Sequence, residues 1–248
     1  MSKPNLPRLP QSFRRPDILP EPTWSRRAGK LWVPPEPSKS ERKIPLKSIA
    51  SFRGAVLDTA ANRQVRFESL LEEKVLCLVQ AFRKDIRAIH DQVLVTYRDG
   101  KGVPHKHYLD YIIDHEDETR TAVTIKPASK VESSRIRWVL GQIRAQHRGT
   151  LAHRFVLISS DSVTPDRVAT ARLILRARRL RNEAAIASIR PLAETLTGAA
   201  PISALLSATR NDALGFMAVV NLIDDGILKL TGTTCLTRDS LVQAVASR

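Results

Sequence analysis

The strongest constraint on the fold is a repeated switch between helical and strand spacing of apolar residues across residues 64–159. Apolar residues recurring every three to four positions predict a helix, and short runs rich in β-branched residues between turn signals predict strands. The order is α-β-β-β-α-β, which predicts an α/β fold. The predicted helices are residues 64–82 and 132–147, and the predicted strands are residues 92–97, 105–114, 121–126 and 154–159.

The N-terminal segment has a different composition from the rest of the chain. Residues 1–50 hold ten of the fifteen prolines and many basic residues. Because proline fixes φ and lacks a backbone N–H, we predict an extended arm rather than a packed helix or sheet. Trp24 and Trp32 interrupt the arm, which suggests that it docks on the body of the protein, on a partner or on DNA. The predicted division is an arm at 1–55, a core at 56–162 and a C-terminal domain at 163–248.

The C-terminal segment opens with a clear helix signal, Thr164 followed by Pro165. Beyond Gly198, two short helices at about 201–208 and 211–225 lead into the strand ILKL, which predicts an α-rich, winged-helix-like unit. The second helix is mostly apolar, and only Arg210 and Asn211 suit contact with base edges. We therefore expect this helix to pack in the core or against another protein.

The charge balance favours a polyanionic partner. The chain has 40 Lys and Arg against 25 Asp and Glu, a net charge of +15, and double-stranded DNA is the first candidate. The alternative is a basic protein without such a partner. No apolar run approaches the ~20 residues of a membrane span, and no signal core begins the sequence. Cys77, expected in the core, and Cys235 form neither a disulfide framework nor a zinc site. We expect a cytoplasmic protein with no membrane partner.

Several charged residues fall where burial would be costly. Asp110 and Lys126 lie in predicted strands, where a charged side chain is seldom buried without a partner. Thr124 shares a strand face with Lys126 because residues i and i+2 point the same way. Glu68 and Glu72 fall on or beside the core-facing stripe of the first predicted helix, where a carboxylate needs a metal or a lysine. The alternatives are residues on solvent-facing strand surfaces and glutamates favoured by the helix dipole.

The motifs FESLLEE, HYLDY and TIKP occur in the order found in a known family. Together with GFMAVVNLIDDGILKL, they resemble the TnsA-type transposon endonucleases of the PD-(D/E)xK nuclease superfamily, over about residues 60–240. The resemblance implies a restriction-endonuclease-like αβββαβ core followed by a winged-helix-like domain. It also implies cleavage of DNA at a transposon end with Mg²⁺, beside a separate transposase subunit and an ATPase regulator.

The resemblance also implies roles for individual residues. Asp110 with Glu68 or Glu72 would hold the metal, and Lys126 would lie beside the attacking water. Thr124 stands where the family has Glu or Gln, and Leu109 replaces a proline. Threonine offers a single neutral oxygen, a poor ligand for a hard cation. The alternatives are a catalytically degenerate nuclease fold that binds DNA or regulates a complex, and an interaction scaffold for which DNA is incidental.

Basic side chains on two helices are candidates for contacts with phosphates. Such contacts give salt-dependent binding without sequence preference, and the alternative is a solvated helix face. His105 and His107 stand two apart and could bind metal or phosphate, although such a pair alone is more often simply polar surface. The predicted nucleic-acid-binding residues are Lys130, Arg135, Arg144, Arg172, Arg176 and Arg179.

Overall fold

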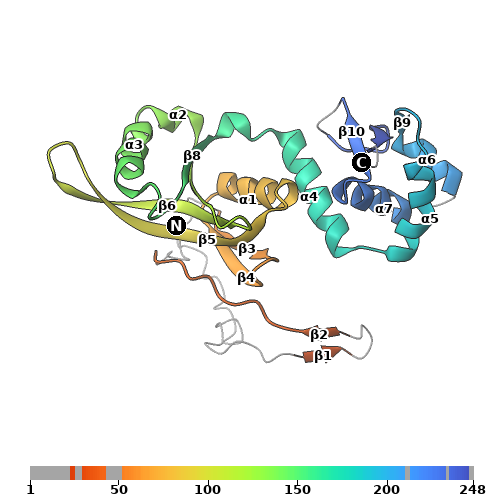
Figure 1. Cartoon of the computed structure of the whole chain (residues 1–248), viewed down its shortest axis with the longest axis horizontal. Coiled ribbons are helices and arrows are strands. Elements are labelled where there is room, and N and C mark those ends of the chain that lie inside the picture. Colours follow the sequence, from red (N-terminus) through yellow and green to blue (C-terminus); the bar gives the residue numbers. More distant parts are fainter. Residues whose placement is uncertain (1–22, 26–29, 43–51, 210–212, 233–234, 246–248) are drawn as a thin grey trace, which may run out of the picture.

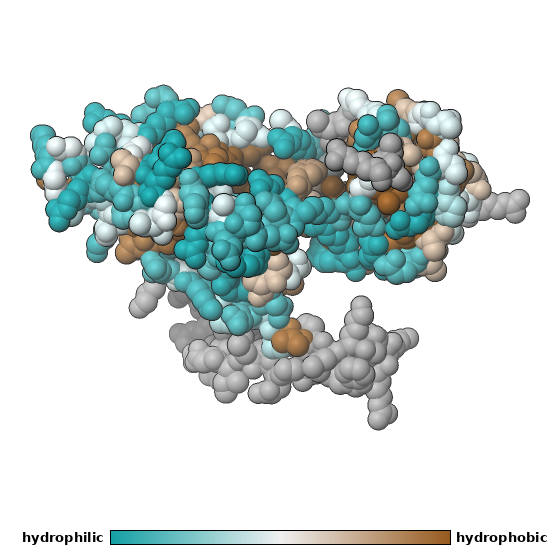
Figure 2. All heavy atoms as spheres, in the orientation of Figure 1, coloured by the Kyte–Doolittle hydropathy of each residue, from teal (hydrophilic) through white to brown (hydrophobic). Residues whose placement is uncertain are grey.

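The computed structural model describes residues 23–25, 30–42, 52–209, 213–232 and 235–245. A part built around a β-sheet precedes a mainly helical C-terminal part, and α4 (Pro165–Arg179) runs from one to the other (Figure 1). Most of the face shown in Figure 2 is hydrophilic, with apolar residues gathered in patches. In the portion described, no helix combines the length and apolarity needed to cross a bilayer.

A four-stranded mixed sheet forms the first part. Its strands are β5 (Ile86–Arg98), β6 (Pro104–His115), β7 (Arg120–Lys126) and β8 (Arg154–Ser159), in that spatial order. The pairs β5–β6 and β6–β7 are antiparallel, whereas β7 and β8 are parallel. The parallel pair needs a crossover, and α2 (Ala128–Val131) and α3 (Ile136–His147) supply it. The predicted α/β class and the order αβββαβ are confirmed.

Two helical layers cover the sheet. Helix α1 (Leu70–Phe82) packs in one cluster with Tyr111 and Val123, and α3 (Ile136–His147) packs in another with Ile112 and Ala122. Neighbouring residues in a strand point to opposite faces, so the two helices lie on opposite sides of β6 and β7. The predicted helix over 132–147 begins later than expected, at Ile136, and a short helix that was not predicted, α2 (Ala128–Val131), precedes it.

The first predicted helix, residues 64–82, is wrong over residues 64–69. Residues of β4 (Arg63–Phe67) pair with β3 (Gly54–Asp58) as an antiparallel hairpin, and their burial alternates as in a strand. The helix begins only after Ser69, whose side chain accepts a hydrogen bond from the Glu72 backbone N–H. This N-cap fixes the helix start, so Glu68 precedes α1 instead of lying on its core-facing stripe.

The described part of the arm docks on the sheet-containing part. Its strands β1 (Thr23–Ser25) and β2 (Lys30–Trp32) pair with each other, so the prediction that no residue of the arm forms a sheet is wrong there. Further along, the Glu36 backbone N–H donates to Asn62 O at 2.9 Å. The Glu36 carbonyl oxygen accepts from the backbone N–H of Gln64, in β4, at 2.8 Å. Docking on the body of the protein is therefore one use of the arm.

Four helices and a small sheet form the C-terminal part. Helix α4 packs against α1, and both contribute to one apolar cluster that includes the buried, free Cys77. Helix α5 was not predicted as a separate element. Residues Val219, Val220 and Leu222 of α7 are buried, which confirms the predicted core packing, whereas Arg210 and Asn211 lie outside the described residues. The elements are α4 (Pro165–Arg179), α5 (Glu183–Glu194), α6 (Ile202–Thr209), α7 (Ala213–Asp224), β9 (Ala200–Pro201), β10 (Leu228–Thr231) and β11 (Leu241–Ala244).

Candidate active site

The sheet forks at Asp110. Strands β6 and β7 pair only over residues 111–114 and 120–123. Beyond that point β6 stays with β5, whereas β7 stays with β8 through Lys126. Asp110 Oδ2 accepts a hydrogen bond of 2.7 Å from the Ile125 backbone N–H, which ties the two branches together. The fork therefore leaves room for side chains between two strands that are no longer paired.

The Asp110 carboxyl group lies in an environment that disfavours its charge. Burial raises its pKa from 3.8 to about 7, and the neighbouring Glu72 carboxylate adds to this increase. The Ile125 N–H, the Lys126 ammonium and the Gln92 side-chain amide act in the opposite direction. Strongly perturbed carboxyl groups are common at sites that bind cations or transfer protons. Asp110 therefore has the chemistry expected of a functional residue.

Glu72 both caps α1 and belongs to the site. Its side chain is only 8% exposed. Oε2 accepts from the Glu68 N–H and Oε1 accepts from the Ser69 hydroxyl, each at 2.8 Å, an arrangement close to a capping box. Burial raises the pKa of Glu72, and the Lys126 charge lowers it. The helix-capping alternative and the site role therefore apply to the same carboxylate.

Glu68 meets the arm. Its Oε2 forms an ion pair of 3.1 Å with Arg42 Nη1, and its buried Oε1 has no hydrogen-bond partner within the described part of the chain. The Arg42 guanidinium also lies 5.5 Å from the centre of the Tyr108 ring. Glu68 therefore reaches the site from outside α1, with one carboxylate oxygen already bound to the arm.

Lys126 and Thr124 follow Asp110 on the other branch of the fork. Among the residues that the structure describes, Lys126 makes no hydrogen bond or ion pair, although its charge acts on Asp110 and Glu72. Thr124 is 1% exposed, and its Oγ1 has no partner. The structure thus brings together Asp110, Glu72 and Lys126, the residues at the centre of the predicted constellation.

Two residues join the site that sequence reasoning missed or underrated. Gln92 of β5 is 1% exposed, has a positive φ of 51°, and holds a buried Oε1 without a partner. His107 of β6 holds a buried Nε2 without a partner, and burial and then the Lys126 charge lower its pKa. The available signal for Gln92 was its position directly before the apolar run VLVTY, within a predicted strand.

Buried polar atoms without partners concentrate here. Native proteins pair most buried polar atoms, and each unpaired one costs about 1–3 kcal/mol unless a water, ion or ligand binds it. Such atoms at the fork are ready acceptors or donors for a bound group. They are Glu68 Oε1, Gln92 Oε1, His107 Nε2 and Thr124 Oγ1.

The oxygen donors fit a hard, hydrated cation. Within the described ranges, no cluster of three or more His, Cys, Asp or Glu side chains is arranged to hold a metal by itself. Mg²⁺ keeps several waters and usually takes one or two carboxylates from the protein. Asp110 and Glu72 supply two carboxylates, and the unpaired oxygens of Gln92 and Thr124 supply neutral acceptors. The residues therefore fit Mg²⁺ without a third acid.

The predicted phosphate-binding residues separate into two groups. Lys130, Arg135 and Arg144 are exposed on α2 and α3, and Arg135 has a left-handed backbone conformation, with φ 52°. In α4, Arg176 and Arg179 are also exposed, but Arg172 pairs with Glu73 of α1 at 2.6 Å. Arg172 therefore holds α4 against α1, and its charge is already compensated.

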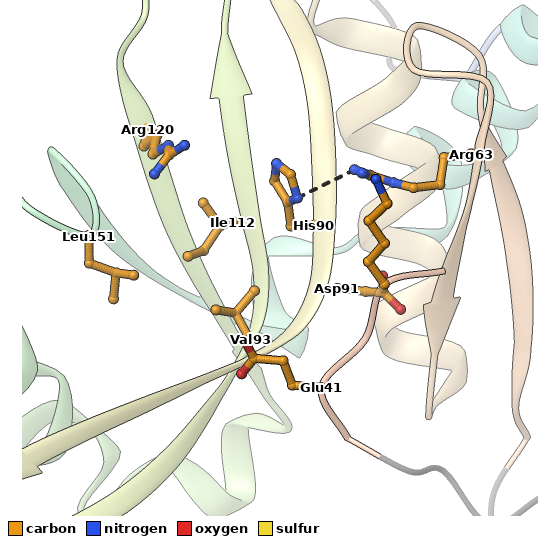
Figure 3. A pocket seen from close by; sticks show the side chains of 9 residues that line it. Glu41, Arg63, His90, Asp91, Val93, Ile112, Arg120 and Leu151 are labelled. Carbon is orange, nitrogen blue, oxygen red and sulfur yellow. Dashed lines mark hydrogen bonds between the residues drawn. The ribbon is translucent and has the colours of Figure 1, made fainter. Parts of the chain in front are cut away.

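A pocket of about 230 Å³ lies apart from the fork, beside β5 (Figure 3). Arg63, His90 and Arg120 line it, but none of the predicted catalytic residues does. The Asp114 carboxylate binds His90 Nε2 and Arg120 Nε, each at 2.9 Å. These contacts compensate the charge of the buried Asp114 and explain the local charges without a ligand.

Comparisons with known proteins add no family to this geometry. No family model matches the chain, and no curated protein matches it in sequence. The residues at the fork are therefore the basis for assigning a function.

Proposed function

We propose that the protein is a Mg²⁺-dependent DNA endonuclease of the TnsA-like type. The observation that carries the proposal is the juxtaposition of Asp110, Glu72 and Lys126 at the fork, where Asp110 has a pKa of about 7. In this proposal the αβββαβ part is a restriction-endonuclease-like core and the C-terminal part is winged-helix-like. The motif order in the sequence supports the same reading.

The chain's own residues have distinct roles in this proposal. Asp110 and Glu72 hold the cation, with Glu68 available once its bond to Arg42 opens. A divalent cation supplies Lewis acidity toward a phosphodiester oxygen and lowers the pKa of water. The Lys126 ammonium, which has no competing partner among the described residues, donates to a phosphate oxygen and stabilises the charge that develops there. Ile125 N–H keeps Asp110 in place through its 2.7 Å hydrogen bond.

The wider surface orients the DNA. Exposed Lys130, Arg135 and Arg144 lie on the helices that follow Lys126 in the chain, and contacts with phosphates from such residues position a duplex without reading its sequence. The partners proposed are double-stranded DNA, a transposase subunit and an ATPase regulator in the cytoplasm. The net charge of +15 supports the first of these.

The test is cleavage of supercoiled plasmid and of a labelled duplex with Mg²⁺, Mn²⁺ or chelator. Wild type should cut only with metal, and Lys126→Ala and Asp110→Ala should each lose at least about a hundredfold in rate. Lys106→Ala is the matched control, because Lys106 is an exposed lysine on β6. Cutting by Lys126→Ala at the wild-type rate would place the activity elsewhere.

One observation favours a second candidate, a degenerate nuclease fold that serves as a DNA-binding or regulatory module. Thr124 puts a neutral hydroxyl where the family has an acid or amide, and this hydroxyl has no partner. The second candidate predicts tight, salt-sensitive DNA binding without cutting, even when a partner transposase is added.

A further inference from the structure

We infer that Gln92 completes the cation site, with its side-chain Oε1 as the neutral oxygen ligand beside the carboxylates of Asp110 and Glu72. This inference rests on the proposed function and goes further, because it assigns to β5 the ligand that the family takes from the position of Thr124. Neither the motifs nor the resemblance points to Gln92.

The position of Gln92 follows from the strand register. Asp91 pairs with Tyr111 and Val93 pairs with Leu109, so Gln92 lies opposite Asp110. The Gln92 side-chain amide lowers the pKa of the Asp110 carboxyl group, which indicates that the NH₂ end of the amide faces the carboxylate. A carboxylate only accepts, so the amide NH₂ is the donor. The two ends of an amide share one carbon atom, so Oε1 also lies beside Asp110.

The oxygen of the amide is left unpaired. Oε1 is buried and has no hydrogen-bond partner among the residues that the structure describes. A buried carbonyl oxygen in this state destabilises the fold unless something binds it. Amide oxygens are ordinary ligands of hard cations such as Mg²⁺ and Ca²⁺. A cation held by Asp110 would satisfy Oε1 at the same time.

The backbone of Gln92 also carries strain. Its φ of 51° lies in the left-handed region, in the interior of β5 and not in a turn. Glycine adopts this conformation freely, whereas a glutamine there is strained, and such strain is concentrated at functional sites. A residue that is strained and also holds an unpaired oxygen is a poor choice for packing alone. Its side chain therefore has a use other than filling space.

The charge balance favours a neutral ligand at this point. Two carboxylates already repel each other, as the effect of Glu72 on Asp110 shows, and Lys126 compensates part of their charge. A third acid would add to this repulsion in the absence of metal. A neutral oxygen from Gln92 adds a ligand without that cost.

The experiment compares Mn²⁺ binding and thermal unfolding of the full chain. Mn²⁺ alone is titrated by electron paramagnetic resonance into wild type, Gln92→Gly, Gln92→Glu and Asp110→Ala. Unfolding midpoints are recorded in chelator. Gln80→Ala is the matched control, because the Gln80 side chain donates to Leu57 O at 3.1 Å on the exposed surface.

For Gln92→Gly we expect Mn²⁺ binding to weaken by about 10- to 100-fold, with a midpoint equal to or above that of wild type because the strain is removed. Gln92→Glu should bind Mn²⁺ at least as tightly as wild type. Gln80→Ala should bind like wild type, and Asp110→Ala should not bind.

Three results would overturn the inference, and they separate it from the proposed function. If Gln92→Gly binds Mn²⁺ like wild type while Asp110→Ala does not, Gln92 is not a ligand and the nuclease proposal stands. If Gln92→Gly lowers the midpoint and Gln92→Glu fails to bind, Gln92 is a structural residue. If wild type itself does not bind Mn²⁺, the inference and the proposed metal chemistry fail together.

Discussion

Arg178 of α4 holds the carboxylate of Asp224 on α7 by two hydrogen bonds, from Nε to Oδ2 at 2.6 Å and from Nη2 to Oδ1 at 2.7 Å. The same guanidinium donates to the carbonyl oxygens of Gln80 and Ala81, at 2.7 and 2.9 Å, where α1 ends. Lys84 pairs with Asp224 as well. One side chain therefore satisfies the end of a core helix and links it to the C-terminal part.

Replacing Arg178 by alanine should destabilise both parts together. It leaves the largely buried Asp224 with Lys84 alone and removes a donor from two helix carbonyls, so we expect a loss of about 2–3 kcal/mol in the free energy of unfolding. Denaturant unfolding measures it. Arg179→Ala, at an exposed neighbouring position, should stay within about 0.5 kcal/mol. Additive losses in Arg178→Ala and Asp224→Ala would contradict the link.

The pH dependence of stability should report on Asp110. Its pKa is about 7 in the folded protein against an ordinary 3.8, so the folded state binds the proton more tightly and stability falls as pH rises between these values. Asp110→Asn removes this dependence. In chelator, wild type should lose on the order of 2 kcal/mol more than the variant from pH 5 to pH 8. The free energy of unfolding is measured in urea at each pH. If it falls equally with pH in wild type and in Asp110→Asn, Asp110 ionises normally.

The unpaired hydroxyl of Thr124 predicts a stabilising substitution. Thr124→Val keeps the shape of a buried side chain and removes an oxygen that has no partner. In chelator the free energy of unfolding should rise by about 1 kcal/mol. A loss of stability would mean that a water or a backbone group satisfies Oγ1. Thr121→Val is the comparison. The Thr121 hydroxyl bonds to His115 Nε2 at 2.9 Å, so this substitution should lower the free energy of unfolding.

Two substitutions at Glu72 should separate its cap from its site role. Glu72→Gln can accept from the Glu68 N–H with its amide oxygen and donate from its NH₂ to the Ser69 hydroxyl, which reverses the second bond, so stability should change by less than about 0.5 kcal/mol. Glu72→Ala should cost about 1 kcal/mol. Both should lose metal-dependent cleavage. Glu73→Gln, which weakens the ion pair with Arg172, should still cut DNA. If Glu73→Gln is inactive, the loss of cleavage at Glu72 does not identify Glu72 as a site residue.

DNA affinity at increasing salt should sort the basic residues. Lys130→Ala and Arg144→Ala remove exposed charges, so each should lower the slope of log affinity against log salt by about 1. Arg172→Ala should leave the slope nearly unchanged because Glu73 already neutralises Arg172. Fluorescence anisotropy on a labelled duplex measures these slopes. If Arg172→Ala lowers this slope as much as the other two substitutions do, α4 contacts the DNA.

Sequence patterns predicted the parts of the site that depend on local periodicity. Strand β8 spans the predicted residues, Arg154–Ser159, because alternating burial gives a strand a clear signature. Asp110, Thr124 and Lys126 were placed on neighbouring strands because charged residues in apolar runs stand out. The fork that joins them was not predictable, since it depends on where two strands stop pairing.

The errors came from interactions that are distant in sequence or involve the backbone. Phe67 fits both a helical stripe and the alternating burial of β4, and the Ser69 cap decides between them. The positive φ of Gln92 leaves no trace in composition. The ion pair of Arg172 was not predicted because its partner, Glu73, lies on another helix.

The docked arm has a consequence for how the sheet meets other chains. Strand β5 is an edge of the four-stranded sheet, and an open edge invites a foreign strand to add to it. Here Glu41 Oε2 accepts from the Leu94 backbone N–H at 2.8 Å, and the Ser38 hydroxyl donates to Asp91 at 2.6 Å. The hydrogen bond that an incoming strand would need from Leu94 is thus already made within the chain. We therefore expect the arm to hinder the addition of a foreign strand at this edge, and with it aggregation.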